Sequence, residues 1–131
     1  MRVNRDHIGG EVTKDNSTYI LQDNNLLDNL TLSKTTLKPM QCTGGHSHDD
    51  LEEVYFFMKG RGRMQLGDET FEVKAEDIIL IPQGKFHKVY NDMHIPMEFV
   101  CVFEKYDRDS DVAKYTENDV KEQNDLYPFT K

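Results

Sequence analysis

The stretch His46-Ser47-His48, followed five residues later by Glu53, is the part of this sequence that decides most about its fold. In an extended strand, alternate side chains point to the same side, so His46 and His48 can contact one ligand together. On a helix, the same spacing would turn the two side chains about 200° apart. The pair therefore favours an extended segment and indicates a binding site built on β-structure.

A second stretch, Pro82-Gln83-Gly84, places a third imidazole just beyond a tight turn, at His87. Three neutral imidazoles and one carboxylate form a ligand set for a divalent ion, and the set suits Fe, Mn, Ni, Co, Cu or Zn. The sequence therefore predicts one such ion, of unspecified identity. Its expected ligands are His46, His48, Glu53 and His87.

The two stretches resemble the two signature motifs of the cupin superfamily. The first motif is roughly G-x5-H-x-H-x3,4-E-x6-G, and the matching residues here are His46, His48, Glu53 and Gly60. Glu53 rather than Glu52 is the expected ligand, because only Glu53 has the motif's distance to Gly60. The second motif is G-x5-P-x-G-x2-H-x3-N, matched by Pro82, Gly84, His87 and Asn91.

The sequence departs from both motifs at the leading glycine, where it has Met40 in the first and Glu76 in the second. In the family these glycines serve backbone turns, so the departures concern loop geometry rather than metal ligation. Asn91 is expected to be structural, since Asn favours turns and hydrogen-bonds to local backbone.

The resemblance implies an all-β fold, the double-stranded β-helix or jelly-roll barrel of the cupins. Independently, turn residues recur every eight to twelve positions, as in a β-sandwich or barrel. The expected strands are 18–22, 30–37, 53–58, 61–66, 70–73, 78–81, 87–91 and 97–104. The expected organisation is an N-terminal arm (1–17), one cupin barrel (18–106) and a C-terminal tail (107–131) with short helical turns.

Composition limits the class of protein. The net charge of −8 argues against a nucleic-acid-binding protein, because contacts to phosphate need a basic surface. No apolar run approaches the ~20 residues that cross a membrane, and the N-terminus lacks a signal sequence, so a cytoplasmic protein is expected. Cys42 and Cys101 are too few for a disulfide framework and are expected to be reduced thiols.

Strand parity identifies further site residues. Tyr55 lies two positions after Glu53 and shares its face, so it is expected to line the metal cavity as a general acid or base. The alternative is that Tyr55 is simply part of the core. On the next strand either Met64 and Leu66, or Arg63 and Gln65, face inward, and the pattern does not decide between them.

The superfamily includes many activities, so function is expected only in outline. Residues 51–63 resemble the small stand-alone cupins often labelled mannose-6-phosphate isomerase-like. The resemblance implies a metal-dependent enzyme, an isomerase or lyase acting on a small polar or anionic metabolite. The alternatives are a non-enzymatic metal- or metabolite-binding module and an iron-dependent dioxygenase. Segments 54–58 and 97–103 are apolar on both faces, which predicts a homodimer.

Overall fold

The computed structural model describes residues 1–48 and 50–106, and within them it is an all-β protein with no helix. The strands are β1 (Glu11–Asp15), β2 (Tyr19–Asn24), β3 (Leu30–Leu37), β4 (Glu53–Lys59), β5 (Arg61–Leu66), β6 (Glu69–Lys74), β7 (Ile78–Ile81), β8 (His87–Asn91) and β9 (Met97–Glu104). The all-β prediction is confirmed. The expected tail, residues 107–131, lies outside the described residues. No helix within the described ranges is long and apolar enough to span a membrane.

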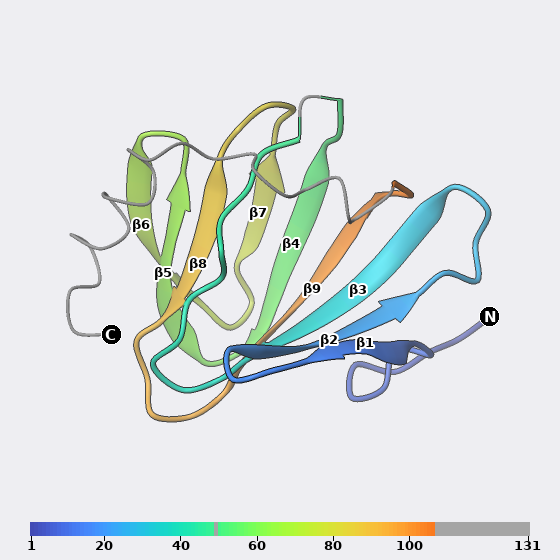
Figure 1. The fold of residues 1–131 in the computed structure, drawn as a ribbon, viewed down its shortest axis with the longest axis horizontal. Helices are drawn as coiled ribbons and strands as arrows, with labels where there is room; N and C mark the ends of the chain where they lie inside the picture. Colours follow the sequence, from blue (N-terminus) through green and yellow to red (C-terminus); the bar gives the residue numbers. More distant parts are fainter. Residues whose placement is uncertain (49, 107–131) are drawn as a thin grey trace.

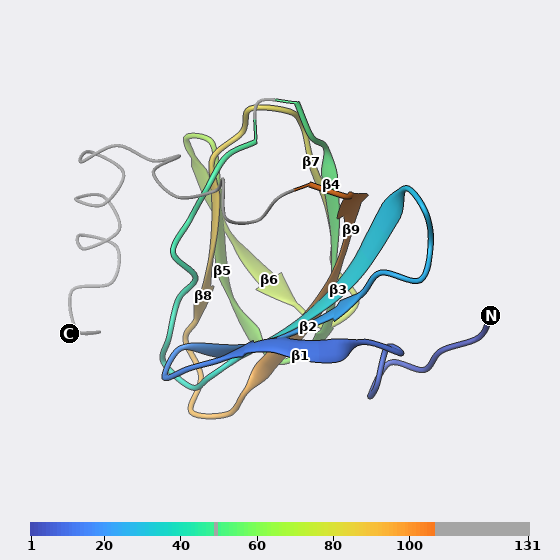
Figure 2. The same cartoon turned by 45° about the vertical axis from the view of Figure 1, so that its right-hand side comes forward.

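The strands form two antiparallel sheets. The larger sheet has the order β1-β2-β3-β9-β4-β7, and the smaller has the order β6-β5-β8. Figures 1 and 2 show the smaller sheet facing the β4, β7 and β9 part of the larger one. β3 and β9 pair along their whole length, from Leu30↔Glu104 to Leu37↔Met97. The chain thus closes into a barrel whose two ends are lined by loops.

The core lies between the two sheets. Its aromatic part is contributed by β4 and β9, where the Tyr55 ring stacks on Phe99 with 5.2 Å between centroids and Phe57 lies 5.1 Å from the same ring. The smaller sheet contributes Met64, which is fully buried. Leu66 packs against this core.

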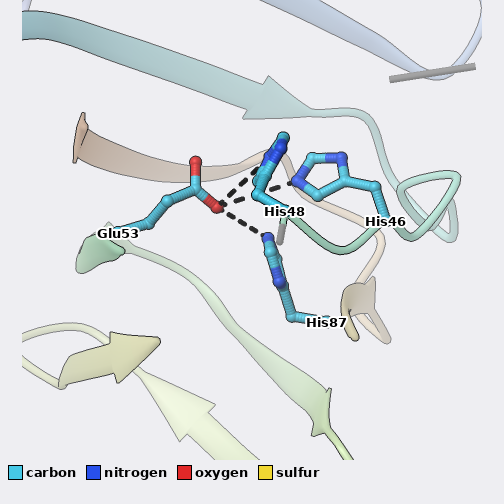
Figure 3. Close-up of side chains that lie close together, drawn as sticks. All are labelled: His46, His48, Glu53 and His87. Carbon is cyan, nitrogen blue, oxygen red and sulfur yellow. Dashed lines mark ion pairs between the residues drawn. The ribbon is translucent and has the colours of Figure 1, made fainter. Parts of the chain in front are cut away.

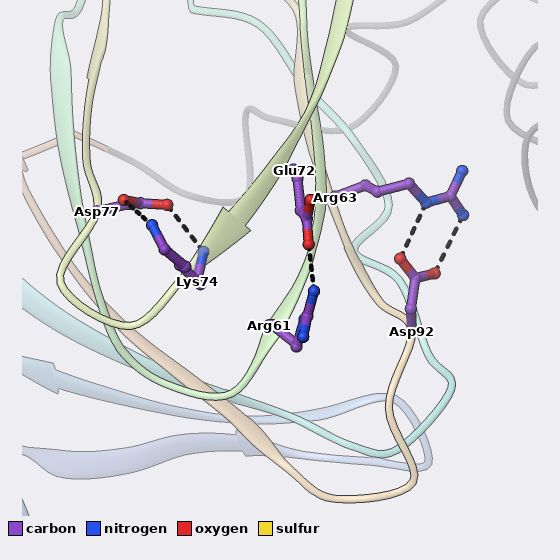
Figure 4. Close-up of polar contacts among 6 residues, drawn as sticks. All are labelled: Arg61, Arg63, Glu72, Lys74, Asp77 and Asp92. Carbon is purple, nitrogen blue, oxygen red and sulfur yellow. Dashed lines mark hydrogen bonds and ion pairs between the residues drawn. The ribbon is translucent and has the colours of Figure 1, made fainter.

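The inward face of β5 is therefore the one that carries Met64 and Leu66. Arg63 points away from the core and pairs with Asp92, its Nε lying 3.0 Å from Oδ2 (Figure 4). Arg61 pairs in the same way with Glu72 on β6, at 2.5 Å (Figure 4). Charged residues of β5 are thus neutralised by neighbours on the outer face, and the methionine and leucine fill the barrel.

β1 falls within the expected N-terminal arm, where no strand is predicted from the sequence. All five of its residues are exposed, so the segment has no alternating apolar pattern. It is held by backbone pairing to β2, from Glu11↔Asp23 to Asp15↔Ile20, with an irregularity between Val12 and Lys14. A strand that buries no side chain cannot be found from hydrophobic periodicity.

The two positions where the chain lacks the motif glycine both have a glycine-like backbone. Met40 has φ of 58° and Glu76 has φ of 82°, the two positive values among the described non-glycine residues. A left-handed conformation costs an L-residue about 1–2 kcal/mol. The loops therefore keep the geometry that the glycines would serve, with some strain at each position.

Replacing Glu76 by glycine is expected to stabilise the fold. Glycine adopts the left-handed conformation without the strain of about 1–2 kcal/mol that glutamate has there. This gain exceeds the roughly 0.5–1 kcal/mol by which the flexibility of glycine stabilises the unfolded chain. The net gain should be about 0.5–1 kcal/mol, or roughly 2–4 °C in the midpoint of thermal unfolding. Glu76→Ala is the control, because it removes the same side chain but keeps Cβ. Equal midpoints for the two variants would show that φ at this position is not strained.

Asn91, at the end of β8, ties three segments together in the barrel. Its Nδ2 donates to the carbonyls of Leu37 (3.1 Å), Lys38 (3.2 Å) and Ile95 (2.8 Å), and its Oδ1 accepts from the N–H of Met93 (2.9 Å). Asn91 itself is fully buried. The structural role expected for Asn91 agrees with this network.

Asn91→Ala is expected to cost roughly 3–5 kcal/mol, because it removes about four hydrogen bonds of about 1 kcal/mol each and leaves buried backbone groups without partners. Urea denaturation of the wild type and of Asn91→Ala measures the difference in the free energy of unfolding. The matched control is Asn16→Ala, which removes an exposed asparagine whose Oδ1 accepts two backbone hydrogen bonds in the β1–β2 turn. If Asn91→Ala lowers the free energy of unfolding by no more than Asn16→Ala does, Asn91 does not have this structural role.

Candidate metal centre

Two loops meet at one end of the barrel and bring the candidate ligands together. The backbones of His46 and His87 exchange two hydrogen bonds, N to O at 3.1 and 2.9 Å, and form an isolated antiparallel bridge. The N–H of Gly84 donates to the carbonyl of His48 at 2.6 Å. The segment before β4 and the β7–β8 turn are therefore fixed to each other, and they lie at the same end of the barrel in both views (Figures 1 and 2).

The four predicted ligands converge at this end. Glu53 begins β4 in the larger sheet, and His87 begins β8 in the smaller one. Figure 3 shows the three imidazoles directed at the carboxylate, with Glu53 Oε2 lying 3.8 Å from His46 Nε2, 3.9 Å from His48 Nε2 and 2.8 Å from His87 Nε2. One ligand atom from each residue lies within 4.8 Å of the other three. The structure thus joins residues that are 41 positions apart in the chain, from His46 to His87.

Three of these atoms have no hydrogen-bond partner among the described residues. They are His46 Nε2, His87 Nε2 and Glu53 Oε2, and each is shielded from solvent. Buried polar atoms in folded proteins are nearly always paired, so a group of three unpaired ones needs an explanation. His87 Nε2 and Glu53 Oε2 are close, but their geometry is not that of a hydrogen bond. A divalent ion between them would satisfy all three atoms at once, so these residues fit the expected ion.

Glu53 is placed to be an ionised ligand. Its side chain is only 4% exposed, and this burial by itself raises the pKa of the carboxyl group. The His46 and His87 imidazoles beside it outweigh that effect and hold the pKa of Glu53 well below its usual range. The carboxylate is therefore charged at neutral pH, which is the form that binds a metal.

A hydrogen bond from the ring nitrogen that does not face Glu53 fixes the orientation of His87. Its Nδ1 lies 2.9 Å from the carbonyl oxygen of Lys85, which can only accept a hydrogen bond. Nδ1 must therefore carry a proton, and Nε2 is the nitrogen directed at Glu53. Metal-binding histidines typically have such a partner on the other ring nitrogen, because it fixes the tautomer and the ring.

Tyr55 borders both the candidate centre and the core. Its ring meets the His87 ring edge to face, with 5.5 Å between centroids, and it also contacts the rings of Phe57 and Phe99. Parity with Glu53 therefore places it beside the centre, as the sequence predicts. The role of its hydroxyl stays a prediction.

Tyr106 also contacts the centre, although nothing in the sequence predicts that it does. Its hydroxyl oxygen lies 3.4 Å from His48 Nε2, and the two rings are 4.7 Å apart and tilted by 66°. Tyr106 follows β9 at the boundary of the expected tail and belongs to neither motif. No spacing signal in the sequence could have assigned it to the site.

The remaining candidate features lie apart from these four ligands. Cys42 is partly exposed and pairs with Tyr90 in an isolated bridge, and Cys101 is buried in the core. A cavity of about 380 Å³ lies over β5 and β6, but its lining includes the paired charges Arg61–Glu72 and Arg63–Asp92 (Figure 4). Charges that neutralise each other do not form a convergent ligand set.

Comparisons with solved structures show the fold. The structure of KdgF from Halomonas sp. is similar with a TM-score of 0.68 at 12% identity, over 82% of this chain and 96% of that one. A protein described as a predicted oxalate decarboxylase, from Thermotoga maritima, is similar with a TM-score of 0.64 at 21% identity, over 81% of this chain and 100% of that one. The double-stranded β-helix predicted from the sequence is confirmed by a further neighbour described by that name, from Klebsiella pneumoniae, with a TM-score of 0.64.

Comparisons of sequence show the family. The uncharacterized protein MJ1618 of Methanocaldococcus jannaschii is 43% identical over 56 residues, which is 43% of this chain and 45% of that protein. The chain thus spans less than half the length of this curated relative. The family description of the cupin domain (Cupin_2) matches residues 33–103, which include all four candidate ligands. This chain belongs to the cupin family.

Proposed function

We propose that this cupin binds one divalent metal ion through His46, His48, Glu53 and His87 and acts as a metal-dependent enzyme on a small polar or anionic metabolite. The observation that carries the proposal is the convergence of three imidazole nitrogens and an ionised carboxylate, with three of the four atoms buried and lacking hydrogen-bond partners among the described residues. Around a five- or six-coordinate ion, four protein ligands leave one or two positions for an exogenous ligand, whereas around a four-coordinate ion they would form a closed structural site.

An ion held by these residues would supply Lewis-acid catalysis, through polarisation of a carbonyl or carboxylate oxygen. The protein's part is to hold the ligands in place and to exclude most water. The side chain of His46 is 28% exposed, whereas those of the other three ligands are at most 6% exposed. A small molecule would therefore approach from the side of His46, and an isomerase or lyase reaction on a sugar-like or carboxylate substrate fits this accessible yet largely dry site.

The proposal is tested by elemental analysis of protein purified without an affinity tag, followed by a substrate panel with and without a chelator. We expect about one divalent ion per chain and an activity that the chelator removes. Iron or manganese would favour the dioxygenase alternative, because these metals support oxygen chemistry. A bound ion with no activity on any substrate would instead favour a non-enzymatic binding module.

We also propose that the chain forms a symmetric homodimer through the outer face of the larger sheet. Register places Val54 beside Leu80 on β7 and beside Val102 on β9, so three apolar side chains lie in one row. Leu80 is 69% exposed, and the neighbouring Ile78 is 59% exposed. A contiguous apolar face on an edge strand marks an interaction surface, and a two-fold axis would cover it with a copy of itself.

Light scattering is expected to give twice the 15.3 kDa mass of the chain at micromolar concentration. Leu80→Glu should shift the protein to the monomer, because it places two like charges in an apolar interface. The control is Leu26→Glu, a substitution of an exposed leucine in the β2–β3 loop, which should leave the dimer intact. A wild-type mass of one chain would rule out this assembly.

A further inference from the structure

Tyr106 connects the candidate metal centre to a separate polar cavity. On one side, its ring lies against His48 and its hydroxyl oxygen is 3.4 Å from Nε2, the nitrogen directed at Glu53. Behind it, the ring meets Phe103 of β9 edge to face at 5.5 Å. These two contacts fix the phenol beside the centre, at a point where neither cupin motif supplies a residue.

On its other side, Tyr106 forms part of the wall of a cavity of about 270 Å³. The residues that line the cavity are Asp23, Asn25, Thr31, Phe103, Lys105 and Tyr106. Thr31 pairs with Phe103 in the β3–β9 register, and Phe103 in turn pairs with Glu53. Since pairs in register share a face, the cavity lies on the same inner face of the sheet as Glu53, and Tyr106 is common to the cavity and the metal centre.

The distance from the Tyr106 hydroxyl to His48 determines whether the hydroxyl can reach an anion bound to the ion. Ligand atoms on neighbouring positions of a divalent ion lie about 3 Å apart, given metal–ligand bonds of about 2.1 Å. An anion bound next to His48 Nε2 would thus lie about 3 Å from that nitrogen, and the phenol oxygen is 3.4 Å from the same nitrogen. These two distances allow the phenol oxygen and a bound anion to be hydrogen-bonding neighbours when the anion takes the position on the Tyr106 side of His48.

We infer that Tyr106 is a substrate-positioning residue, whose hydroxyl donates a hydrogen bond to a small anion bound to the ion at its open position. The inference rests on the proposed function, since it needs a bound ion. It extends that function by adding a recognition group outside the two motifs. The cavity beyond Tyr106 would receive the polar remainder of such a ligand. Its lining includes the Asp23 carboxylate and the Lys105 ammonium, whose Nζ donates to the Asn25 carbonyl at 3.1 Å.

The test uses the cobalt(II)-loaded protein and azide as the anionic probe, with binding followed in the visible spectrum of the cobalt ion. In Tyr106→Phe the dissociation constant for azide should rise about 10- to 100-fold, as expected when a hydrogen bond to a charged group is lost. Cobalt stoichiometry should be unchanged, because the phenol is not a ligand to the ion. Tyr19→Phe is the control, since Tyr19 is a half-buried tyrosine of β2 that packs on the core. Tyr106→Leu, which also lacks the hydroxyl, should show the same loss of azide affinity, and circular dichroism verifies that both variants are folded.

The other outcomes overturn the inference. Unchanged azide binding in both variants would show that the hydroxyl does not reach the bound anion. Loss of cobalt from Tyr106→Phe would make Tyr106 a ligand or a structural residue instead. If the wild type binds no cobalt, the proposed function fails together with the inference. If the wild type binds cobalt and the variants bind azide normally, only the inference fails.

Discussion

His87→Ala is expected to lose nearly all bound metal while the barrel stays folded. Removal of a hydrogen-bond partner behind a metal ligand lowers affinity 10- to 100-fold in typical sites, so loss of the ligand itself should lower it by more than about 100-fold. His87 supplies the nitrogen nearest to the carboxylate, 2.8 Å from Glu53 Oε2. The measurement is metal content after dialysis against a weak chelator, with circular dichroism to verify the fold.

The control for this variant is His94→Ala. His94 is exposed and lies outside the group of four ligands, so its removal should leave metal content unchanged. An unchanged metal-to-protein ratio in His87→Ala would contradict the ligand assignment. Equal losses in both variants would point to a general effect of removing histidines rather than to this centre.

Tyr55→Phe is expected to reduce turnover on a substrate found in the panel by about 10²–10⁴-fold, the usual contribution of a general acid or base. The variant keeps the ring that stacks on Phe99 and meets His87, so stability should change by less than about 1.5 kcal/mol and metal content should hold. Turnover is compared at saturating substrate, and urea denaturation checks the stability.

Tyr19→Phe again serves as the control, because it removes a phenolic hydroxyl elsewhere on the core. If turnover in Tyr55→Phe matches that of the wild type, Tyr55 is a core residue, and the proton carrier must be sought among the other groups at the centre. A fall in metal content would instead assign Tyr55 a role in holding the ligands.

The fold was predictable from sequence wherever strands bury side chains. β4 and β9 have strong apolar patterns, and both were expected close to their observed bounds. β1 was not expected, because all of its residues are exposed and its pairing with β2 leaves no apolar pattern in the sequence. The sequence did not decide which face of β5 points inward, because a short strand can bury either Arg63 or Met64. The structure decides it: Arg63 pairs with Asp92 away from the core, and Met64 is buried.

The candidate ligands were predictable because they occupy the ligand positions of the two motifs at the expected spacing. The structure brings all four together. Met40 and Glu76 could be recognised as departures from the motifs, but their positive φ values follow only from the loops in which they lie. Tyr106 could not be found at all. It contacts His48 across 58 residues of sequence, and no local pattern encodes such a contact.

The most direct test of the four-ligand metal centre is an anomalous difference map from crystals of the metal-loaded protein, recorded on either side of the metal's absorption edge. A single strong peak per chain is expected, about 2.0–2.2 Å from Nε2 of His46, His48 and His87 and from Oε2 of Glu53. A peak bound elsewhere, or no peak among these four residues in fully loaded crystals, would contradict it.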